Sequence, residues 1–329
     1  MATNLRASTE QLLVDSGGEG SFRRYVVKIR PEINEHIEAL FSTYGWENET
    51  CSGLRDLMSG GKRLRAGLAL LTFDAFALDG SGRDTALDLA GAVEIAHSAS
   101  LILDDMLDGD EVRRGRKAVH VSKGQKKALL EMTGLLSVPY SIVNVHGSRF
   151  TECLASTHRA VVEGELAQVD ASGKECTLER YERIISLKTG QMFALAARFG
   201  AMAADRSDPL IKQLATFGLS VGTIMQVADD ITDLGKVTEE RAISGHGSEL
   251  LLWRGLDRLP AGPGVPPRST DAEKKARMME LLNDHIGRGE DALPTNLSRR
   301  LRTRPGAEHL LACLRRAPRE IAEIAMDAP

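Results

Sequence analysis

Apolar residues recur with a period near 3.6 along most of this 329-residue chain, and no other feature limits the possible folds as strongly. Alternating β-branched runs, which are typical of strands, are scarce, and aromatic residues make up only 4% of the chain. The spacing predicts helices over residues 22–42, 62–78, 84–108, 124–137, 141–170, 178–203, 208–234, 271–287 and 307–326. Several of these segments are long for a globular protein, so we expect an all-α fold, a large helix bundle.

The turn-rich residues 1–21 are predicted to form a mobile arm, and residues 22–329 a single domain, because no linker separates two cores. Pro31 is expected to kink or split the first helix. The Pro- and Gly-dense segment 259–267 is expected to be an irregular loop.

Composition excludes several classes of protein. With 42% apolar and 27% charged residues, the chain is too apolar to be disordered. The net charge of −4 argues against a partner such as nucleic acid, which overall basic charge would attract. The sequence predicts no apolar run of the roughly 18 residues that a membrane span needs, and the acidic start resembles no signal peptide, so a cytoplasmic location is expected. The four dispersed cysteines are expected to be reduced.

Two acidic clusters end strongly apolar helical stretches. In the first, helical spacing places Asp104 and Asp108 one turn apart on one face, beside Asp105, with His97 farther back along that face. The second cluster repeats this stripe with Gln226, Asp229, Asp230 and Asp233. Mg²⁺ usually binds one or two carboxylates together with substrate phosphates, so two facing clusters predict Mg²⁺ around a diphosphate. The alternative, a solvated polar helix face, is disfavoured because both clusters continue stripes that should be buried.

Basic residues that could bind the same anion lie at three places in the chain. Arg113 and Arg114 follow the first acidic cluster, and Lys62 and Arg65 lie one turn apart after two glycines. The segment Lys188-Thr189-Gly190 interrupts a helical stretch, where a freed backbone could also meet phosphate. Each segment alone could be a surface patch or a helix cap, and it is their order along the chain that favours a site.

That order, GGKRLR, EIAHSASLILDDMLDGDEVRRG, LKTGQMFALAARFGA and MQVADDITDL, resembles the trans-isoprenyl diphosphate synthases of the polyprenyl synthetase family, and in particular geranylgeranyl diphosphate synthases. The resemblance covers about residues 53–235. It implies antiparallel helices around a deep central cavity, a homodimer, and Mg²⁺-dependent head-to-tail condensation of isopentenyl diphosphate with an allylic diphosphate. In the reaction that the resemblance implies, an allylic cation forms, isopentenyl diphosphate attacks it, and the proton leaves to the released diphosphate.

The resemblance also implies the roles of particular residues. About three Mg²⁺ ions per active site would be held by the acidic set Asp104, Asp105, Asp108, Asp229, Asp230 and Asp233. The allylic diphosphate would be bound with the help of Arg113, Lys188, Thr189 and Gln226, and isopentenyl diphosphate by Lys62, Arg65, His97 and Arg114. Ala99 and Ser100 stand where aromatic residues favour farnesyl products, so geranylgeranyl diphosphate is expected, with Phe73 and Phe76 as candidate deeper residues of the cavity.

The chain departs from the family pattern at Ala66, Leu103 and Met225, and more strongly after Asp233. Residues 235–260 look like a degenerate lid in which Lys236 or Arg254 would replace the usual lysines, and residues after 260 have little recognisable match. Two alternatives therefore stay open. One is a class I terpene cyclase, or a prenyltransferase acting on another acceptor, and the other is a non-catalytic partner subunit. The retained cations disfavour the first, and the two complete acidic sets disfavour the second.

Overall fold

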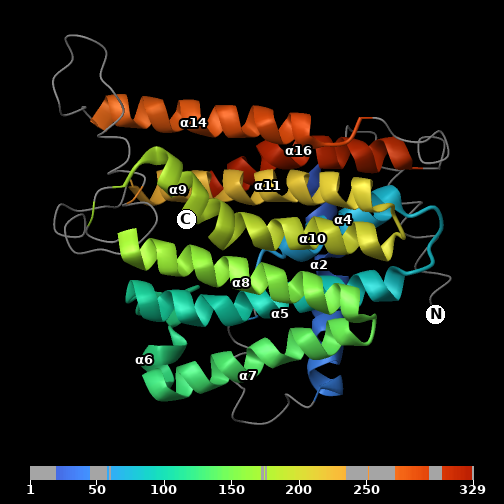
Figure 1. The fold of residues 1–329 in the computed structure, drawn as a ribbon, viewed down its shortest axis with the longest axis horizontal. Helices are drawn as coiled ribbons and strands as arrows, with labels where there is room; N and C mark the ends of the chain where they lie inside the picture. Colours follow the sequence, from blue (N-terminus) through green and yellow to red (C-terminus); the bar gives the residue numbers. More distant parts are fainter. Residues whose placement is uncertain are drawn as a thin grey trace.

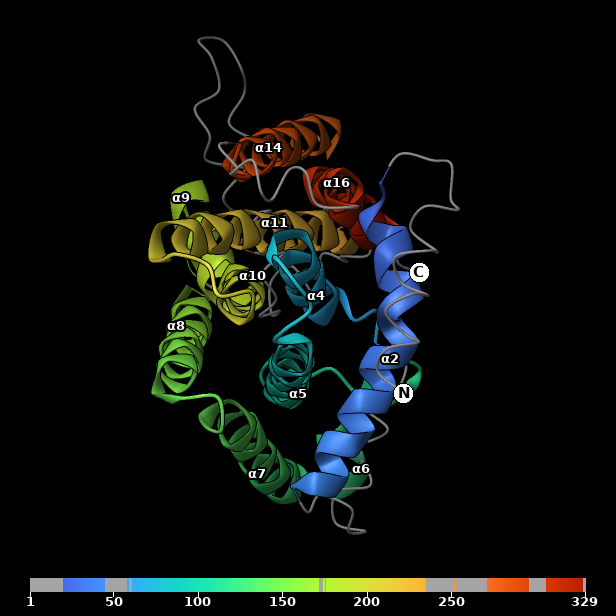
Figure 2. The same ribbon diagram turned by 90° about the vertical axis from the view of Figure 1, so that its right-hand side faces the viewer.

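Helix α5 (Arg83–Asp108) lies at the centre of the fold, with α2, α4, α10, α8 and α7 around it when the molecule is viewed along α5 (Figure 2). The structure is a computed structural model that describes residues 20–44, 58, 61–171, 174, 176–234, 251, 271–295 and 306–327. Small residues let neighbouring helices approach α5 closely. A Cβ atom on Gly91, for example, would lie 2.5 Å from Cδ1 of Leu40 on α2. The apolar run of the sequence is therefore the core helix of a bundle.

The described helices confirm the all-α prediction, and most lie roughly side by side while α2 crosses them (Figure 1). Their bounds are α2 Phe22–Thr43, α4 Leu64–Phe76, α5 Arg83–Asp108, α6 Val119–Lys123, α7 Gln125–Asn144, α8 Ser148–Ala171, α9 Leu178–Ile185, α10 Gln191–Ala203, α11 Asp208–Leu234, α14 Asp271–Ala292 and α16 Ala307–Met326. A π-helical turn, η2 (Ser186–Gly190), joins α9 to α10, and two short strands, β1 (Val112–Arg113) and β2 (Arg116–Lys117), form an antiparallel hairpin.

Prolines interrupt fewer helices than the sequence suggests. The predicted break between residues 137 and 141 is wrong, because α7 continues through Pro139 to Asn144 and the chain turns at Gly147, whose φ is 117°. Helix α2 likewise runs unbroken through Pro31. In both helices, burial of an apolar face compensates for the hydrogen bond that proline cannot donate.

The C-terminal helices α14 and α16 cover α11, and α16 also packs on α2 and α4. The end of the predicted N-terminal arm is held there. Ser21 caps α2, and its hydroxyl donates to Glu320 of α16 at 2.9 Å, while Gly20 is buried against the backbone of α16. The rest of the predicted arm, residues 1–19, lies outside the described residues, as does nearly all of the segment 235–270 with the predicted lid and loop.

Within the described part of the chain, α5 is long and apolar enough to cross a membrane by length and composition, which the sequence prediction did not expect. However, 67% of its apolar window is buried inside the protein. The apolar character of α5 is therefore explained by its place in the core.

Candidate active site

The first acidic cluster lies where α5 ends. Gly109, in the left-handed conformation with φ 72°, terminates the helix directly after Asp108. Arg114 and Gly115 also have positive φ, 53° and 74°, and form the tight turn of the β1–β2 hairpin. This hairpin returns Arg113 to α5, where its Nε donates to Oδ1 of the fully buried Asp105 at 2.7 Å. Asp105 is thus paired with an arginine within its own motif.

Lys188 is the cation that interacts with the other two aspartates of this cluster, Asp104 and Asp108. The Nζ atom of Lys188 is 3.4 Å from Oδ1 of Asp104. Burial raises the pKa of Asp108, and the charge of Lys188 opposes that shift. Within the described structure, Oδ1 of Asp108 and Oδ2 of Asp105 are buried and accept no hydrogen bond. Buried carboxylate oxygens of this kind are suited to a cation.

Lys188 comes from the π-helical turn η2, which confirms the predicted interruption at residues 188–190. Helix α8 approaches this turn closely at Gly164, where a Cβ atom would lie 2.8 Å from the backbone N of Lys188. Two residues of α8 that the sequence analysis missed also contact the lysine: Nζ lies 3.1 Å from Glu165 Oε2 and 3.4 Å from Gln168 Oε1. A signal was available, because Glu165 directly follows this glycine and the polar Gln168 lies one helical turn later.

The second acidic cluster is held by a chain of hydrogen bonds. Thr189 Oγ1 donates to Gln226 Oε1 at 2.6 Å, and Gln226 Nε2 donates to Asp230 Oδ1 at 2.8 Å. The hydroxyl of Tyr181, which the sequence analysis also missed, donates to the other oxygen of Asp230 at 2.7 Å. Thr189, Gln226 and Asp230 therefore do come together as expected, with Asp230 buried and engaged by its neighbours.

Asp229 faces the cations at the start of α4. Burial raises the pKa of Asp229 to about 6, the positive charges of Lys62 and Arg65 oppose this, and Asp233 adds to it. Asp233 is exposed at the end of α11. The two ends of the predicted site, acidic and basic, are thus within electrostatic reach of each other.

Two arginines, Arg63 and Arg65, lie at the start of helix α4. Arg63, at the N-cap, has a positive φ of 57°, and the buried Glu94 accepts from the backbone N–H of Ala66 at 3.0 Å. The guanidinium of Arg65 lies 4.7 Å from the centre of the Phe193 ring, and its Nε, which is buried, finds no hydrogen-bond partner in the described structure. Burial lowers the pKa of Arg65 to about 10. Arg65 is therefore a buried cation with an unused donor.

The other residues predicted to bind isopentenyl diphosphate are His97, Arg114 and Lys62. A Cβ atom on Gly61 would lie 2.8 Å from Arg63 Nη1 and 3.4 Å from Arg114 Nη2, so this glycine lets Arg114 reach the start of α4. The pKa of His97 lies well below its usual value, because of burial and then the nearby charges of Arg65 and Arg114. Lys62 Nζ donates to the carbonyl of Ile324 on α16 at 3.0 Å.

An apolar pocket leads away from the first acidic cluster. Asp104 and Glu165 line one end, and side chains of α5, α7 and α8 form the walls together with Met192. Ser100 lines the pocket as expected, whereas its neighbour Ala99 is fully buried and is not part of the lining. Phe73 and Phe76 do not line the pocket either, because α4 directs both into the core.

The acidic clusters do not enclose a metal by themselves. Among the residues that the structure describes, no group of three Asp, Glu, His or Cys side chains is arranged to hold an ion. This arrangement suits Mg²⁺, which usually takes one or two carboxylates and completes its shell with waters and substrate phosphates. Asp104, Asp108 and Asp229 lie at helix ends where such an ion could join them to a diphosphate.

A family model described as Polyprenyl synthetase matches residues 49–242, more than half of the chain. The chain belongs to the polyprenyl synthetase family. It is 32% identical to a geranylgeranyl diphosphate synthase of Methanosarcina mazei over 200 residues, which cover 59% of this chain and 60% of that relative. It is 30% identical to the mitochondrial geranylgeranyl pyrophosphate synthase 10 of Arabidopsis thaliana over 294 residues, 84% of this chain and 81% of that relative.

Comparison with solved structures confirms the fold. The geranylgeranyl pyrophosphate synthetase from Pyrococcus horikoshii superposes with a TM-score of 0.71 over 93% of this chain and 99% of that one, at 21% identity. Family membership identifies the chain as a prenyltransferase that elongates prenyl chains. Members of the family act on isoprenoid diphosphates and use divalent metal ions.

Proposed function

We propose that this polyprenyl synthetase condenses isopentenyl diphosphate head-to-tail with an allylic diphosphate, in the presence of Mg²⁺, to give all-trans geranylgeranyl diphosphate. One observation carries the proposal: the ammonium group of Lys188 contacts both Asp104 and Glu165, the two acidic residues at the polar end of the apolar pocket. A diphosphate held at this end would direct its prenyl chain into the pocket, where little water can reach the reacting carbon.

We assign Mg²⁺ binding first to Asp104, Asp108, Asp229 and Asp233, with about three ions when substrate is bound. When bound, these ions would stabilise the negative charge on the departing diphosphate. Asp105 and Asp230 stay predicted ligands. Their oxygens meet Arg113, Tyr181 and Gln226 in this structure, so the two aspartates would also hold the shape of the site.

Two different sets of side chains would bind the two substrates. Lys188 and Thr189 would bind the allylic diphosphate, with Arg113 and Gln226 supporting the acidic clusters. Arg65, His97, Arg114 and Lys62 would bind isopentenyl diphosphate, for which Lys62 exchanges the Ile324 carbonyl for phosphate oxygens. The released diphosphate accepts the proton lost on elongation, so the reaction needs no protein base.

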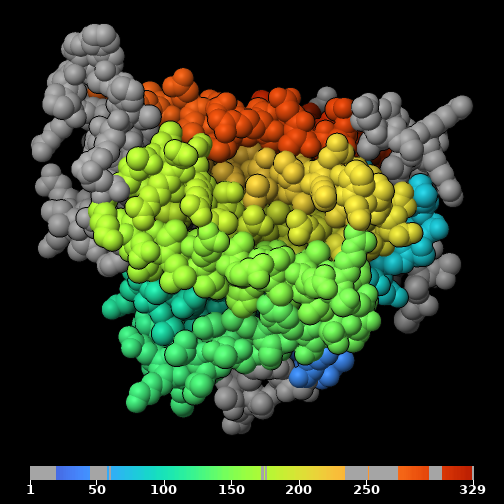
Figure 3. Space-filling view, viewed as in Figure 1, coloured from blue at the N-terminus to red at the C-terminus, as the bar shows by residue number. Residues whose placement is uncertain are grey.

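The proposed assembly is a homodimer in the cytoplasm. Helices α7 and α8 lie side by side on one face of the molecule (Figure 3), and both expose large apolar side chains, namely Leu129, Leu130, Val162, Leu166 and Val169. Thiols rather than a disulfide at Cys153 and Cys313 agree with a reducing compartment. Light scattering of the purified protein tests the dimer, and a Leu166→Glu variant that stays folded but monomeric would place the interface on α8.

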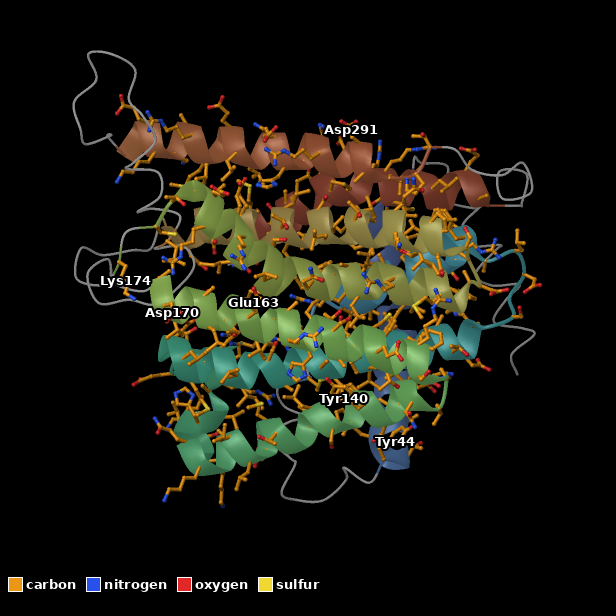
Figure 4. The ribbon with its side chains drawn as sticks, in the orientation of Figure 1. Tyr44, Tyr140, Glu163, Asp170, Lys174 and Asp291 are labelled. Carbon is orange, nitrogen blue, oxygen red and sulfur yellow. The ribbon has the colours of Figure 1, made fainter. Side chains whose placement is uncertain are left out.

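A product assay tests the reaction. Purified protein is given Mg²⁺, isopentenyl diphosphate and, separately, dimethylallyl, geranyl, farnesyl or geranylgeranyl diphosphate, and extracts are analysed before and after phosphatase treatment. We expect a longer prenyl alcohol only after phosphatase. Asp104→Ala should lower kcat/KM by at least about 100-fold. Glu163→Ala, which removes an exposed carboxylate of α8 (Figure 4), serves as the charge-matched control and should leave the rate unchanged.

Other results would contradict the proposal. A hydrocarbon or alcohol that forms without phosphatase and without isopentenyl diphosphate would identify a terpene cyclase. A folded protein without any activity, which gains activity only with a second polypeptide, would identify a partner subunit.

A further inference from the structure

Two polar side chains meet inside the apolar pocket, about two turns of α8 from Glu165 and the acidic end. They are Tyr140 of α7 (Figure 4) and His158 of α8, and both line the pocket. The hydroxyl of Tyr140 lies 3.0 Å from Nδ1 of His158, and the two ring centres are 6.2 Å apart. This hydrogen bond ties together two of the helices that line the pocket.

The position of the pair along the pocket follows from helix geometry. His158 is seven residues from Glu165 on the same helix, which corresponds to about 10 Å along the axis of α8. On α5, Ser100 and then Ala96 line the pocket at about 6 Å and 12 Å from Asp104. Both are small, so α5 leaves space open at these depths. The first large polar groups that a chain would meet are the rings of Tyr140 and His158.

The chemistry of the pair suits two rings that block a growing prenyl chain inside an apolar pocket. Apart from these two residues, the polar side chains of the lining are Ser100, Asp104 and Glu165, which lie toward the mouth. Burial raises the pKa of Tyr140 and lowers that of His158, so both are neutral near pH 7. Each satisfies the other's hydrogen bond, and both rings are therefore held in place rather than drawn toward water.

We propose that the Tyr140–His158 pair sets product length, because a growing prenyl chain stops where its end meets these two rings. The inference rests on the proposed function and replaces Phe73 and Phe76 as the deeper determinants of length. Removal of either ring would extend the space available to the chain by the volume of an aromatic side chain.

Product analysis after phosphatase treatment tests this proposal. Tyr140→Ala is expected to shift the main product by one or more isoprene units toward longer chains. The kcat for the first condensation should change by less than about threefold, because the reacting groups lie at the acidic end of the pocket, about two helical turns from the pair. His158→Ala should shift the product in the same direction and replaces the tyrosine variant if that one fails to fold. Tyr140→Phe keeps the ring and should keep the wild-type main product.

Leu135→Ala is the matched control, because Leu135 is fully buried on the same helix but does not line the pocket. It should lower the melting temperature without a change of product length. Unchanged product length in active Tyr140→Ala and His158→Ala proteins would overturn the inference while the proposed function stands. The same applies if Tyr140→Phe or Leu135→Ala lengthens the product as much as Tyr140→Ala does. Absence of any elongated product from the wild type would overturn the proposed function, and this inference with it.

Discussion

The Nζ atom of Lys188 lies 3.1 Å from Oε2 of Glu165, a buried carboxylate at the mouth of the pocket. Burial raises the pKa of Glu165 to about 8, Lys188 opposes the shift, and Asp104 adds to it. One ammonium group thus serves two carboxylates, and its position depends on both of them.

Replacement of Glu165 by alanine should therefore misplace Lys188 and lower kcat/KM by about tenfold. Glu165→Gln keeps an oxygen that can accept from the ammonium group and should retain most of the activity. Steady-state kinetics with varied allylic diphosphate measure both variants, and the exposed Glu163→Ala is the control. An alanine variant with wild-type kinetics would show that Glu165 does not position the lysine.

The hydroxyl of Tyr181 stabilises the second acidic cluster, since it donates a hydrogen bond to the buried Asp230 at 2.7 Å. Tyr181→Phe removes this bond while the ring still fills its space. We expect the free energy of unfolding, measured with urea, to fall by about 1–3 kcal/mol, because a buried carboxylate loses a donor. A loss below about 0.5 kcal/mol would mean that water or another donor replaces the hydroxyl.

Asp88 joins three parts of the fold at a distance from the active site. Its two oxygens lie 2.7 Å from His36 Nε2 on α2 and 2.9 Å from His146 Nε2 in the turn after α7. Burial by itself raises the pKa of Asp88, but the hydrogen bonds from both histidines outweigh it and lower the pKa overall. A carboxylate with a lowered folded-state pKa stabilises the protein above its unfolded-state pKa of about 3.9, and this stabilisation is lost as the pH falls through the folded-state value.

Asp88→Asn should accordingly lower the free energy of unfolding at pH 7 by about 1 kcal/mol, and the difference from the wild type should shrink below about pH 3. Urea titrations at both pH values measure it. Asp170→Asn, an exposed change on α8 (Figure 4), should have no effect at either pH. A difference that stays constant with pH would show that the charge of Asp88 is not the source of its stabilisation.

The approach of α10 to α4 depends on a glycine. A Cβ atom on Gly200 would lie 2.1 Å from the backbone oxygen of Ala69, whereas one on Gly287 of α14 would meet no atom within 4 Å. Gly200→Ala should therefore cost at least about 1–3 kcal/mol of unfolding free energy, while Gly287→Ala should stabilise the protein by about 0.5–1 kcal/mol through helix propensity. Thermal unfolding of the two variants in parallel checks both signs. Equal effects would contradict this explanation.

Local sequence determined the helices and the two acidic motifs of this protein. Helical periodicity depends on residues three and four positions apart, so the bounds of α5 and α11 and the shared face of Asp104 and Asp108 could be predicted from the chain alone. The interruption at Lys188 was likewise visible as a local feature. The order of the motifs was sufficient to indicate the family.

Contacts between helices were decided only by the tertiary structure. Pro139 stays inside α7 because packing of an apolar face outweighs one missing hydrogen bond. Prediction from neighbouring residues in the sequence does not include this packing energy. Glu165 meets Lys188, and Tyr140 meets His158, across pairs of helices whose relative positions depend on side-chain volumes throughout the core. The sequence thus determined which residues share a helix face, whereas the packing of the bundle determined what each face meets.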